Sequence, residues 1–176
     1  MDPYTALNTG VSSTIGWMLG TYQLVSNLVL FIPVLIWGRK YIGPGTVINM
    51  VLTGFFIDLF SFLLGPVIPD DPSLLLMTFF FAAGICVFAF GASAYMSAGV
   101  GTAPYDAIAP MIVDKTGWNY IKVRVPQDVL TVIGAILFKG RVGFGTVMTA
   151  FFNGPLIQFF TEKVNQPAVD RLVGKA

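Results

Sequence analysis

The chain has 176 residues, of which 55% are hydrophobic and 11% are charged, and its formal net charge is +1. Soluble domains carry about 25% charged residues, so this composition excludes an ordinary water-covered surface and predicts a membrane protein in contact with the lipid bilayer. The Lys and Arg residues are scattered, which excludes a clustered basic face for nucleic acid. With no His and one Cys, the usual metal ligand sets and catalytic triads cannot be assembled, so we expect no metal, no cofactor and no enzymatic activity.

In chain order, the predicted elements begin with a Pro-Tyr motif at Pro3-Tyr4 and continue with two apolar stretches, residues 20–37 and 46–68. Each stretch approaches the roughly 20 residues that a helix needs to cross the hydrocarbon core. Charge and turn residues end them at Gly38-Arg39-Lys40 and at residues 69–72. Both stretches are therefore predicted to span the membrane.

Three further apolar stretches follow, residues 74–100, 121–138 and 146–160, which gives about five membrane helices in total. The lone Cys86 lies in the first of these stretches and is expected to be a buried packing residue. Residues 99–113 are apolar but rich in Gly and Pro, and too short to cross the bilayer as one helix. We predict a re-entrant or broken helix there, as part of a cavity wall, because irregular backbone at that depth needs protein or water around it. An interfacial loop is the alternative.

Several short motifs recur at a distance of about 100 residues, which indicates an internal duplication. The matched pairs are Pro3-Tyr4 with Pro104-Tyr105, Gly16-Trp17 with Gly117-Trp118, and Gly43-Pro44-Gly45-Thr46 with Gly143-Phe144-Gly145-Thr146. We therefore predict an all-α membrane bundle, one domain made of two repeats, residues 1–73 and 74–176. The Gly-x-Gly-Thr segments are expected to be tight loops with a threonine N-cap rather than anion sites.

The first repeat lacks the helix that precedes the Pro-Tyr motif of the second repeat. Either the natural protein begins upstream, or this repeat has lost its leading helix, and we favour the former. A homodimer is a candidate assembly, because a second copy could replace the missing wall. Three spans per repeat would make the two repeats inverted relative to each other.

The distribution of Lys and Arg in the short loops predicts the orientation of the chain. With alternating spans, most basic residues fall on one side, which we assign to the cytoplasm together with the C-terminus. These residues are Arg39, Lys40, Lys115, Lys122, Arg124, Lys163, Arg171 and Lys175. Lys139 and Arg141 fall on the other side and conflict with the rule.

Asp58 is the clearest candidate for a functional residue, because an ionisable group inside a span costs roughly 3 kcal/mol on insertion scales. It lies near the middle of residues 46–68, and its counterpart in the second repeat is Gln158. Their matched depth predicts that the two side chains face each other across a pseudo-symmetric centre. A polar contact that holds helices together is the alternative.

A second polar group, Arg124, Gln127 and Asp128, surrounds Pro126. Arg124 and Asp128 stand four residues apart on one helix face, so they are placed to form an ion pair. Either that pair is the whole explanation, or the three side chains line a polar cavity where Pro126 frees a carbonyl group. The counterparts in the first repeat are Gln23, Ser26 and Asn27.

The two Pro-Tyr motifs, with Tyr4 and Tyr105, complete the predicted cavity. Asp106 follows Tyr105 near the start of a short helix, where a carboxylate is stabilised by the helix N-terminus. We expect capping to be its main role, because the counterpart in the first repeat is Thr5, which is also a capping residue.

The motifs of the second half form a pattern that resembles the YczE/YitT-like family of bacterial integral membrane proteins. They are Gly99-Val100-Gly101-Thr102-Ala103-Pro104-Tyr105-Asp106-Ala107, Gly143-Phe144-Gly145-Thr146-Val147 and Asn153-Gly154-Pro155-Leu156-Ile157. The resemblance extends over nearly the whole chain. It implies a multi-pass, six-span protein of the bacterial inner membrane, and it supplies no substrate or catalytic residue.

The leading functional hypothesis is a small secondary transporter or permease-like protein that binds an unknown small molecule or ion between its repeats. The candidate site residues are Asp58, Arg124, Gln127, Asp128, Gln158, Tyr4, Tyr105 and Asp106. The alternative is a non-transporting accessory or scaffold protein that acts on a partner through its spans. An intramembrane aspartyl protease is disfavoured, because Thr46 and Thr146 stand where its second carboxylate is needed.

Overall fold

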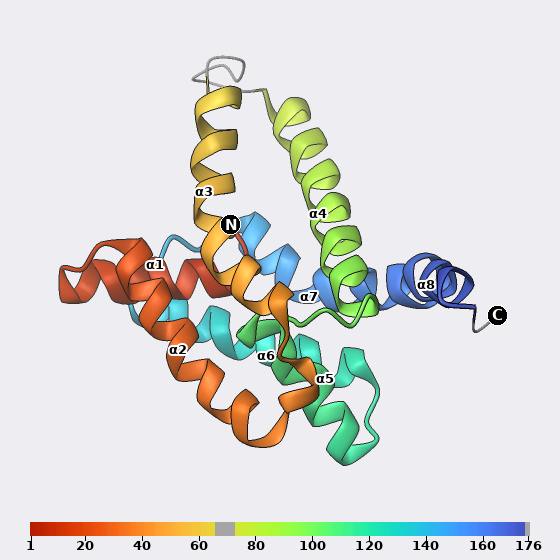
Figure 1. Ribbon diagram of the computed structural model, residues 1–176. Helices are drawn as coiled ribbons and strands as arrows, with labels where there is room; N and C mark the ends of the chain where they lie inside the picture. The colour runs from red at the N-terminus through yellow and green to blue at the C-terminus, as the bar shows by residue number, and fades with distance from the viewer. Residues whose placement is uncertain (66–72, 175–176) are drawn as a thin grey trace.

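The computed structural model describes residues 1–65 and 73–174, apart from the side chains of residues 51, 53–58, 61 and 64. All regular structure in these ranges is helical (Figure 1), which confirms the all-α class. The helices are α1 (Pro3–Ile15), α2 (Leu19–Trp37), the 3₁₀-helix η1 (Arg39–Tyr41), α3 (Pro44–Leu64), α4 (Leu74–Ser97), α5 (Pro104–Thr116), α6 (Tyr120–Leu137), α7 (Phe144–Phe160), the π-helix η2 (Thr161–Asn165) and α8 (Gln166–Leu172).

Each of the five apolar stretches of the sequence forms a helix with nearly the expected bounds, namely α2, α3, α4, α6 and α7. Residues 69–72, the expected separator of the two repeats, lie outside the described residues. The segment 99–113 supplies most of α5, a single helix of 13 residues that runs on to Thr116. At 1.5 Å per residue it is about 20 Å long and cannot cross a hydrocarbon core of about 30 Å.

The two short helices, α1 and α5, begin in the same way. Each has a proline in its first turn, where the fixed φ of proline suits a helix and its missing N–H costs nothing. Asp2 caps α1, since its Oδ1 atom accepts a hydrogen bond from the backbone N–H of Thr5 at 3.0 Å. Ala103 occupies the corresponding place before α5 and has no polar side chain with which to cap it.

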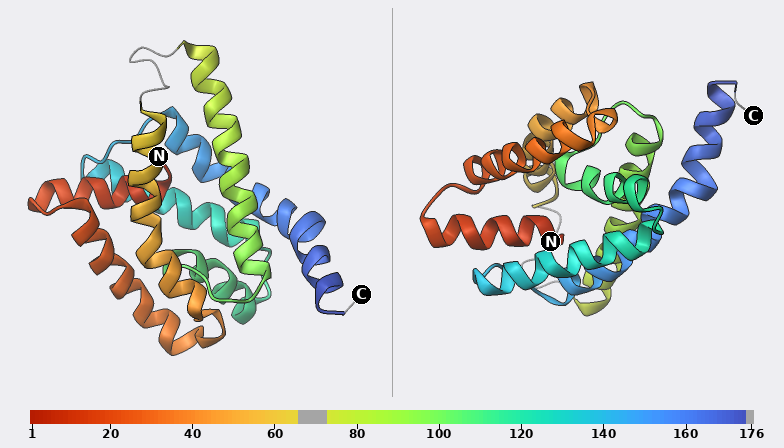
Figure 2. Two further views of the ribbon diagram at one scale, coloured as in Figure 1. Left: turned by 45° about the horizontal axis from the view of Figure 1, so that its top comes forward. Right: turned by 90° about the horizontal axis from the view of Figure 1, so that it is seen from below.

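The short helix of each half packs against a long helix of the other half. α1 lies along α6, and α5 lies along α2 (Figure 2). α6 also packs on α7, which in turn packs on α4. α3 and α4 extend away from this layer of crossing helices (Figure 1), so the two halves meet mainly through α1, α2, α5 and α6.

Two crossings bring backbone against backbone and require glycine. A Cβ atom on Gly140 would lie 2.3 Å from the carbonyl oxygen of Ala6 in α1. A Cβ atom on Gly43 would lie 2.3 Å from the carbonyl oxygen of Val100, which precedes α5. Both distances are far below a van der Waals contact, so these glycines set how closely α1 and the segment before α5 approach their neighbours.

The threonine of each Gly-x-Gly-Thr loop acts differently from the expected N-cap. Thr46 and Thr146 are the third residues of α3 and α7, and their hydroxyl oxygens accept hydrogen bonds from the backbone N–H groups of Gly43 and Gly143 at 3.2 and 3.4 Å. Both threonines are buried. In a capping box, the side chain of the third helical residue accepts a hydrogen bond from the backbone N–H of the N-cap residue. Each threonine makes this one of the two capping-box bonds.

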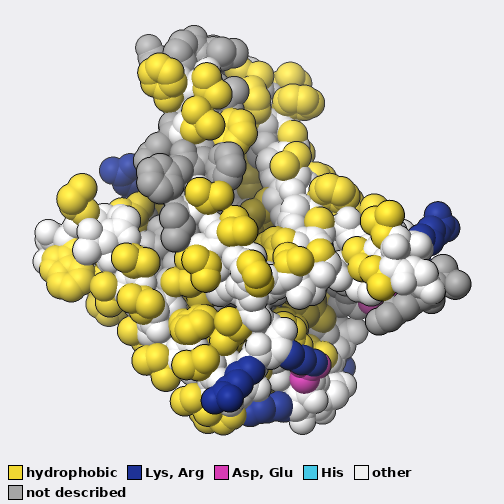
Figure 3. All heavy atoms as spheres, in the orientation of Figure 1, with side chains coloured by type: hydrophobic (Ala, Val, Ile, Leu, Met, Phe, Trp, Pro, Cys, Tyr) yellow, Lys and Arg dark blue, Asp and Glu magenta, His cyan; other side chains and the backbone are white. Residues whose placement is uncertain are grey.

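Polar side chains are buried and large apolar side chains cover the surface. Arg124 and Asp128 are 2% and 0% exposed, whereas Leu75 on α4 is 82% exposed, and apolar side chains spread over the visible face (Figure 3). Cys86 is also exposed, so the expected buried packing role is wrong. Such a surface is typical of a protein covered by lipid rather than by water.

Among the described residues, two helices are long and apolar enough to cross a membrane by length and composition, α2 and α4. Their most apolar windows have mean hydropathies of 1.8 and 2.4, and nearly all of their residues lie at the surface of the fold. A buried core helix of a soluble protein would show the opposite burial. Both helices therefore present their apolar side chains to the surroundings.

Candidate functional site

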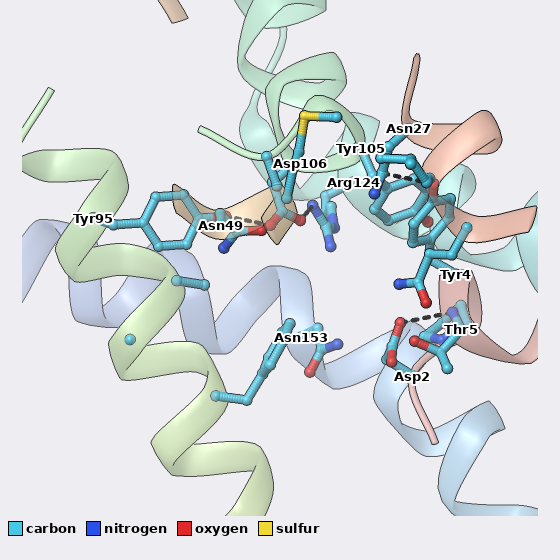
Figure 4. Close-up of a pocket in the computed structure, with 18 of the residues that line it drawn as sticks. Asp2, Tyr4, Thr5, Asn27, Asn49, Tyr95, Tyr105, Asp106, Arg124 and Asn153 are labelled. Carbon is cyan, nitrogen blue, oxygen red and sulfur yellow. Dashed lines mark hydrogen bonds and ion pairs between the residues drawn. The ribbon is translucent and has the colours of Figure 1, made fainter. Parts of the chain in front are cut away.

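The two Pro-Tyr motifs meet in the middle of the fold. The rings of Tyr4 and Tyr105 stack with their centroids 4.6 Å apart and their planes inclined by 19°. Tyr4 lies in the first turn of α1, and Tyr105 lies in the first turn of α5. The contact places the N-terminal ends of the two short helices against each other (Figure 4).

Each of these tyrosines also bonds to the long helix that follows it in the chain. The hydroxyl of Tyr4 donates to Oδ1 of Asn27 on α2 at 2.7 Å, and the hydroxyl of Tyr105 donates to Oδ1 of Asp128 on α6 at 2.6 Å. Both bonds join residues 23 positions apart. The sequence had matched Asn27 with Asp128, and the two occupy equivalent places in the structure.

Arg124 is the centre of a buried charge cluster. Its Nε atom donates to Oδ2 of Asp128 at 3.1 Å, as the spacing of four residues predicted, and its Nη1 atom donates to Oδ1 of Asp106 at 2.8 Å. The second oxygen of Asp106 accepts a hydrogen bond from the hydroxyl of Tyr95 on α4. The guanidinium carbon also lies 5.0 Å from the centre of the Tyr105 ring. Three helices thus hold one arginine.

The expected capping role of Asp106 is wrong. Its carboxylate is directed at Arg124 and Tyr95 instead of at the first N–H groups of α5 (Figure 4). The reason is electrostatic: an arginine that is 2% exposed loses its hydration, and charged hydrogen bonds to carboxylates offset that loss better than any neutral partner. The capping function of a carboxylate falls to Asp2 in the first half.

A cavity of about 930 Å³ lies between these groups, a size that suits a small organic ligand. Seven helices contribute to its wall. The lining residues are Asp2, Pro3, Tyr4, Thr5, Gly20, Gln23, Leu24, Asn27, Asn49, Met50, Val87, Phe88, Gly91, Ala92, Tyr95, Ala103, Tyr105, Asp106, Arg124 and Asn153. Polar side chains lie on opposite parts of this wall, with Tyr95, Asp106 and Arg124 on one part and Asp2 and Asn153 on another (Figure 4), and aliphatic side chains and Phe88 complete it.

The predicted site residues divide into those that line the cavity, those that support its wall from behind, and those that the structure does not place at the cavity. Tyr4, Tyr105, Asp106 and Arg124 line the cavity. Asp128 and Gln127 support it from behind: Asp128 holds Arg124 and Tyr105. The amide of Gln127 donates to the Tyr105 carbonyl oxygen at 2.9 Å.

Gln158 does not join the cavity. Its Nε2 atom donates to Oε1 of Glu162 one helical turn further along at 2.6 Å. It therefore makes a local contact near the junction of α7 and η2. The side chain of Asp58, its expected partner, lies outside the described residues, so the facing arrangement of the two stays a prediction.

Sequence reasoning missed four polar residues of the cavity wall, Tyr95, Asn49, Asn153 and Asp2. Tyr95 stands among small and apolar residues of α4 that resemble helix packing, and Asp2 precedes the first helix. Asn49 and Asn153 are neutral amides inside apolar stretches, so the insertion cost of an ionisable group, which singled out Asp58, did not mark them.

Comparison with known proteins places the chain among families without an assigned activity. A family model described as "Family of unknown function (DUF6198)" matches residues 1–162. The chain belongs to this family. DUF6198 membership agrees with the resemblance drawn from the Pro-Tyr and Gly-x-Gly-Thr motifs.

Two relatives come from Bacillus subtilis. The uncharacterized membrane protein YczE is 29% identical over 159 residues, which cover 90% of this chain and 72% of the relative. The uncharacterized protein YyaS is 29% identical over 170 residues, which cover 97% and 82%. An uncharacterized protein of Haemophilus influenzae is 26% identical over 160 residues, which cover 90% and 70%. No solved structure matches the chain. The relatives and the exposed apolar helices identify this DUF6198 chain as a membrane protein.

Proposed function

We propose that this DUF6198 protein is a small secondary transporter or permease-like protein that binds its substrate in the cavity beside Arg124. The observation that carries the proposal is a buried arginine on the wall of a cavity of about 930 Å³. An ionisable group inside a membrane protein costs several kcal/mol. An arginine kept at that cost on the wall of a cavity supports a role in binding.

The proposal includes two inverted repeats around this cavity, each with a Pro-Tyr helix and long spanning helices. It is supported by the equivalent hydrogen bonds from Tyr4 to Asn27 and from Tyr105 to Asp128. The packing of α1 on α6 and of α5 on α2 supports it as well. In inverted-repeat transporters, substrate sites lie where the repeats meet.

We further propose a multi-pass arrangement in a bacterial inner membrane with a cytoplasmic C-terminus. Basic side chains gather at the end of the molecule formed by the junction of α2 with η1 and the end of α5 (Figure 3). Lys40 there pairs with Asp114 at 2.6 Å, and the Lys115 ammonium lies 4.8 Å from the Trp37 ring centre. The positive-inside rule assigns this end to the cytoplasm. In this proposal the cavity residues bind the substrate and catalyse no reaction.

Cysteine accessibility tests the transport proposal. In a Cys86→Ser background, cysteine is placed at Gly20 or Gly91, two cavity-lining positions where an added Cβ meets no atom within 4 Å. A water-soluble maleimide is applied to right-side-out and to inverted membrane vesicles. We expect both positions to react from both sides, because a transporter opens its cavity alternately to each face.

The matched control is Leu130→Cys, at a site on α6 that is 67% exposed and outside the cavity. It should stay unlabelled, since a lipid-facing position sees no water. Reaction of the cavity positions from one side alone would contradict transport. No reaction from either side would contradict it too, and would favour the alternative, an accessory or scaffold protein with a closed interior.

A further inference from the structure

Two acceptor groups lie on one part of the cavity wall, and one of them is buried without a donor. Asn153 is 1% exposed, and its Oδ1 atom has no hydrogen-bond partner in the described part of the chain. Asp2 also lines the cavity, and its Oδ1 atom accepts the backbone N–H of Thr5. Figure 4 shows both residues on the part of the wall opposite Tyr95, Asp106 and Arg124. A buried acceptor without a donor is costly, so Asn153 indicates a ligand that donates, and the Asp2 carboxylate on the same part of the wall can accept from the same group.

The charge of the cavity wall favours a cation. Arg124 supplies one positive charge, and it is already engaged by Asp106 at 2.8 Å and Asp128 at 3.1 Å. Asp2 adds another carboxylate to the lining. Even when Asp128, behind the wall, is left out, the two lining carboxylates exceed the one guanidinium. An anion entering the cavity would therefore meet net repulsion.

The remainder of the wall is aromatic and aliphatic. The stacked rings of Tyr4 and Tyr105 form one part of it, and Leu24, Val87 and Phe88 offer an apolar surface. A bare metal ion would leave most of a cavity of about 930 Å³ unfilled. The geometry thus requires a ligand with both a charged head and an apolar body.

We propose that the cavity binds an organic cation whose ammonium or guanidinium head donates N–H hydrogen bonds to Asn153 and Asp2 and whose apolar body packs against α2 and α4. An organic cation would be the substrate class of the transporter proposed above, and the biological role of this binding rests on that proposal. The binding itself is independent of transport.

The first test uses four probes that share one phenyl ring and ethyl-type spacer but differ in the head group. Isothermal titration calorimetry at pH 7 measures their binding to the full chain in detergent, with titrations into empty micelles subtracted. Phenethylammonium should bind saturably. Its N,N,N-trimethyl analogue should bind about tenfold more weakly, because it has the charge without the N–H donors. Neutral 2-phenylethanol and anionic phenylacetate should give no saturable heat.

The second test changes the two acceptors. Asp2→Asn keeps the helix cap, because asparagine caps as well as aspartate, and Asn153→Leu removes the amide at similar volume. Each should weaken phenethylammonium binding by about tenfold, as the loss of a hydrogen bond to a charged group does. The controls are Asp170→Asn on α8 and Gln158→Leu on α7, both outside the cavity, and both should bind as the wild type does.

Three outcomes would overturn the inference: saturable binding of phenylacetate or phenylethanol as tight as that of phenethylammonium, no saturable binding of any probe, or unchanged affinity in Asp2→Asn. Its failure is separable from that of the transport proposal. Cation binding by a chain whose cavity cysteines do not react would leave the inference standing and remove transport. Labelling from both sides without cation binding would do the reverse.

Discussion

Arg124 shows how ion pairs offset the cost of burying one charged side chain inside an apolar protein. Its side chain is 2% exposed and is held by Asp106 and Asp128 at 2.8 and 3.1 Å. Breaking a buried ion pair by removing one partner is strongly destabilising, because it leaves the other charge uncompensated. Here the removal of one arginine would leave two carboxylates.

We therefore expect Arg124→Leu to lower the free energy of unfolding by about 3–5 kcal/mol. Thermal unfolding in mild detergent, followed by tryptophan fluorescence, measures the change. Lys122→Leu, two residues away on the exposed side of α6, is the control and should stay within about 0.5 kcal/mol. The double variant Arg124→Leu with Asp128→Leu should recover part of the loss. An Arg124→Leu protein as stable as the control would contradict the role of the cluster.

Asp114 gives a residue-scale prediction for pH. Partial burial acts to raise the pKa of its carboxyl group, but hydrogen bonds from Lys40 and Tyr41 outweigh burial and hold that pKa below its usual value of 3.8. A depressed folded-state pKa stabilises the fold fully above the unfolded-state pKa, and this contribution is lost as the pH falls through the folded-state value. Burial and the Asp114 carboxylate raise the pKa of the Tyr41 hydroxyl, so it remains a donor throughout.

The wild type should accordingly be more stable than Asp114→Asn at neutral pH, by less than about 1 kcal/mol because the pair is partly exposed. The difference should vanish as the pH is lowered past the acidic titration of Asp114. Unfolding midpoints of both proteins from neutral pH to about pH 3 measure it, with Asp170→Asn as the matched control. A difference that is independent of pH would contradict this assignment.

At this scale, the sequence predicted what local spacing determines and missed what the tertiary fold determines. The pairing of Arg124 with Asp128 followed from four residues of helix, and the structure confirms it. The contact of Asp106 with Tyr95 was not predictable in the same way, because Tyr95 lies on α4 and Asp106 on α5. The two side chains meet only because the segment between these helices turns back. A nearby helix N-terminus suggested capping, whereas a dehydrated guanidinium attracted the carboxylate more strongly.

At the scale of elements, hydrophobic runs located the long helices well, because a stretch of apolar residues bounded by charge and glycine has one stable form in lipid. The bounds of α2, α4 and α6 differ from the predicted stretches by at most a few residues. The continuation of α7 into η2 and α8 was not predicted. There Asn165 donates to Ser93 on α4 at 2.9 Å, a contact between residues far apart in sequence that no local pattern contains.

The crossing of α1 with the loop before α7 gives an element-scale prediction. Gly140→Ala would place a Cβ atom 2.3 Å from the carbonyl oxygen of Ala6, and backbone cannot move aside as a flexible side chain can. We expect a loss of about 1–3 kcal/mol or more in the free energy of unfolding. Gly84→Ala in α4 meets no atom within 4 Å and should be neutral or stabilising, since alanine favours helix by about 1 kcal/mol. Equal unfolding midpoints for the two variants would contradict the close approach.

At the scale of the whole molecule, the recurring motifs indicated which residues correspond between the halves but not how the halves combine. The match of Asn27 with Asp128 came from spacing alone. Each short helix packs on a long helix of the other half. This packing is a property of the assembled bundle, and the periodicity of a single segment does not predict it. The cavity depends on that exchange, so its wall could not be derived from the motifs one at a time.

The exchange of short helices also determines the order in which the chain can assemble during synthesis. α1 is made before α6, the helix it lies along, and Thr14 reaches its acceptor Phe138 across 124 residues. Contacts between such distant parts of a chain form slowly, because the intervening loop must close first. We therefore expect α1 and α2 to keep the faces that contact α6 and α5 uncovered until the second half is made, and the ring of Tyr105 can stack on Tyr4 only after α5 has been made.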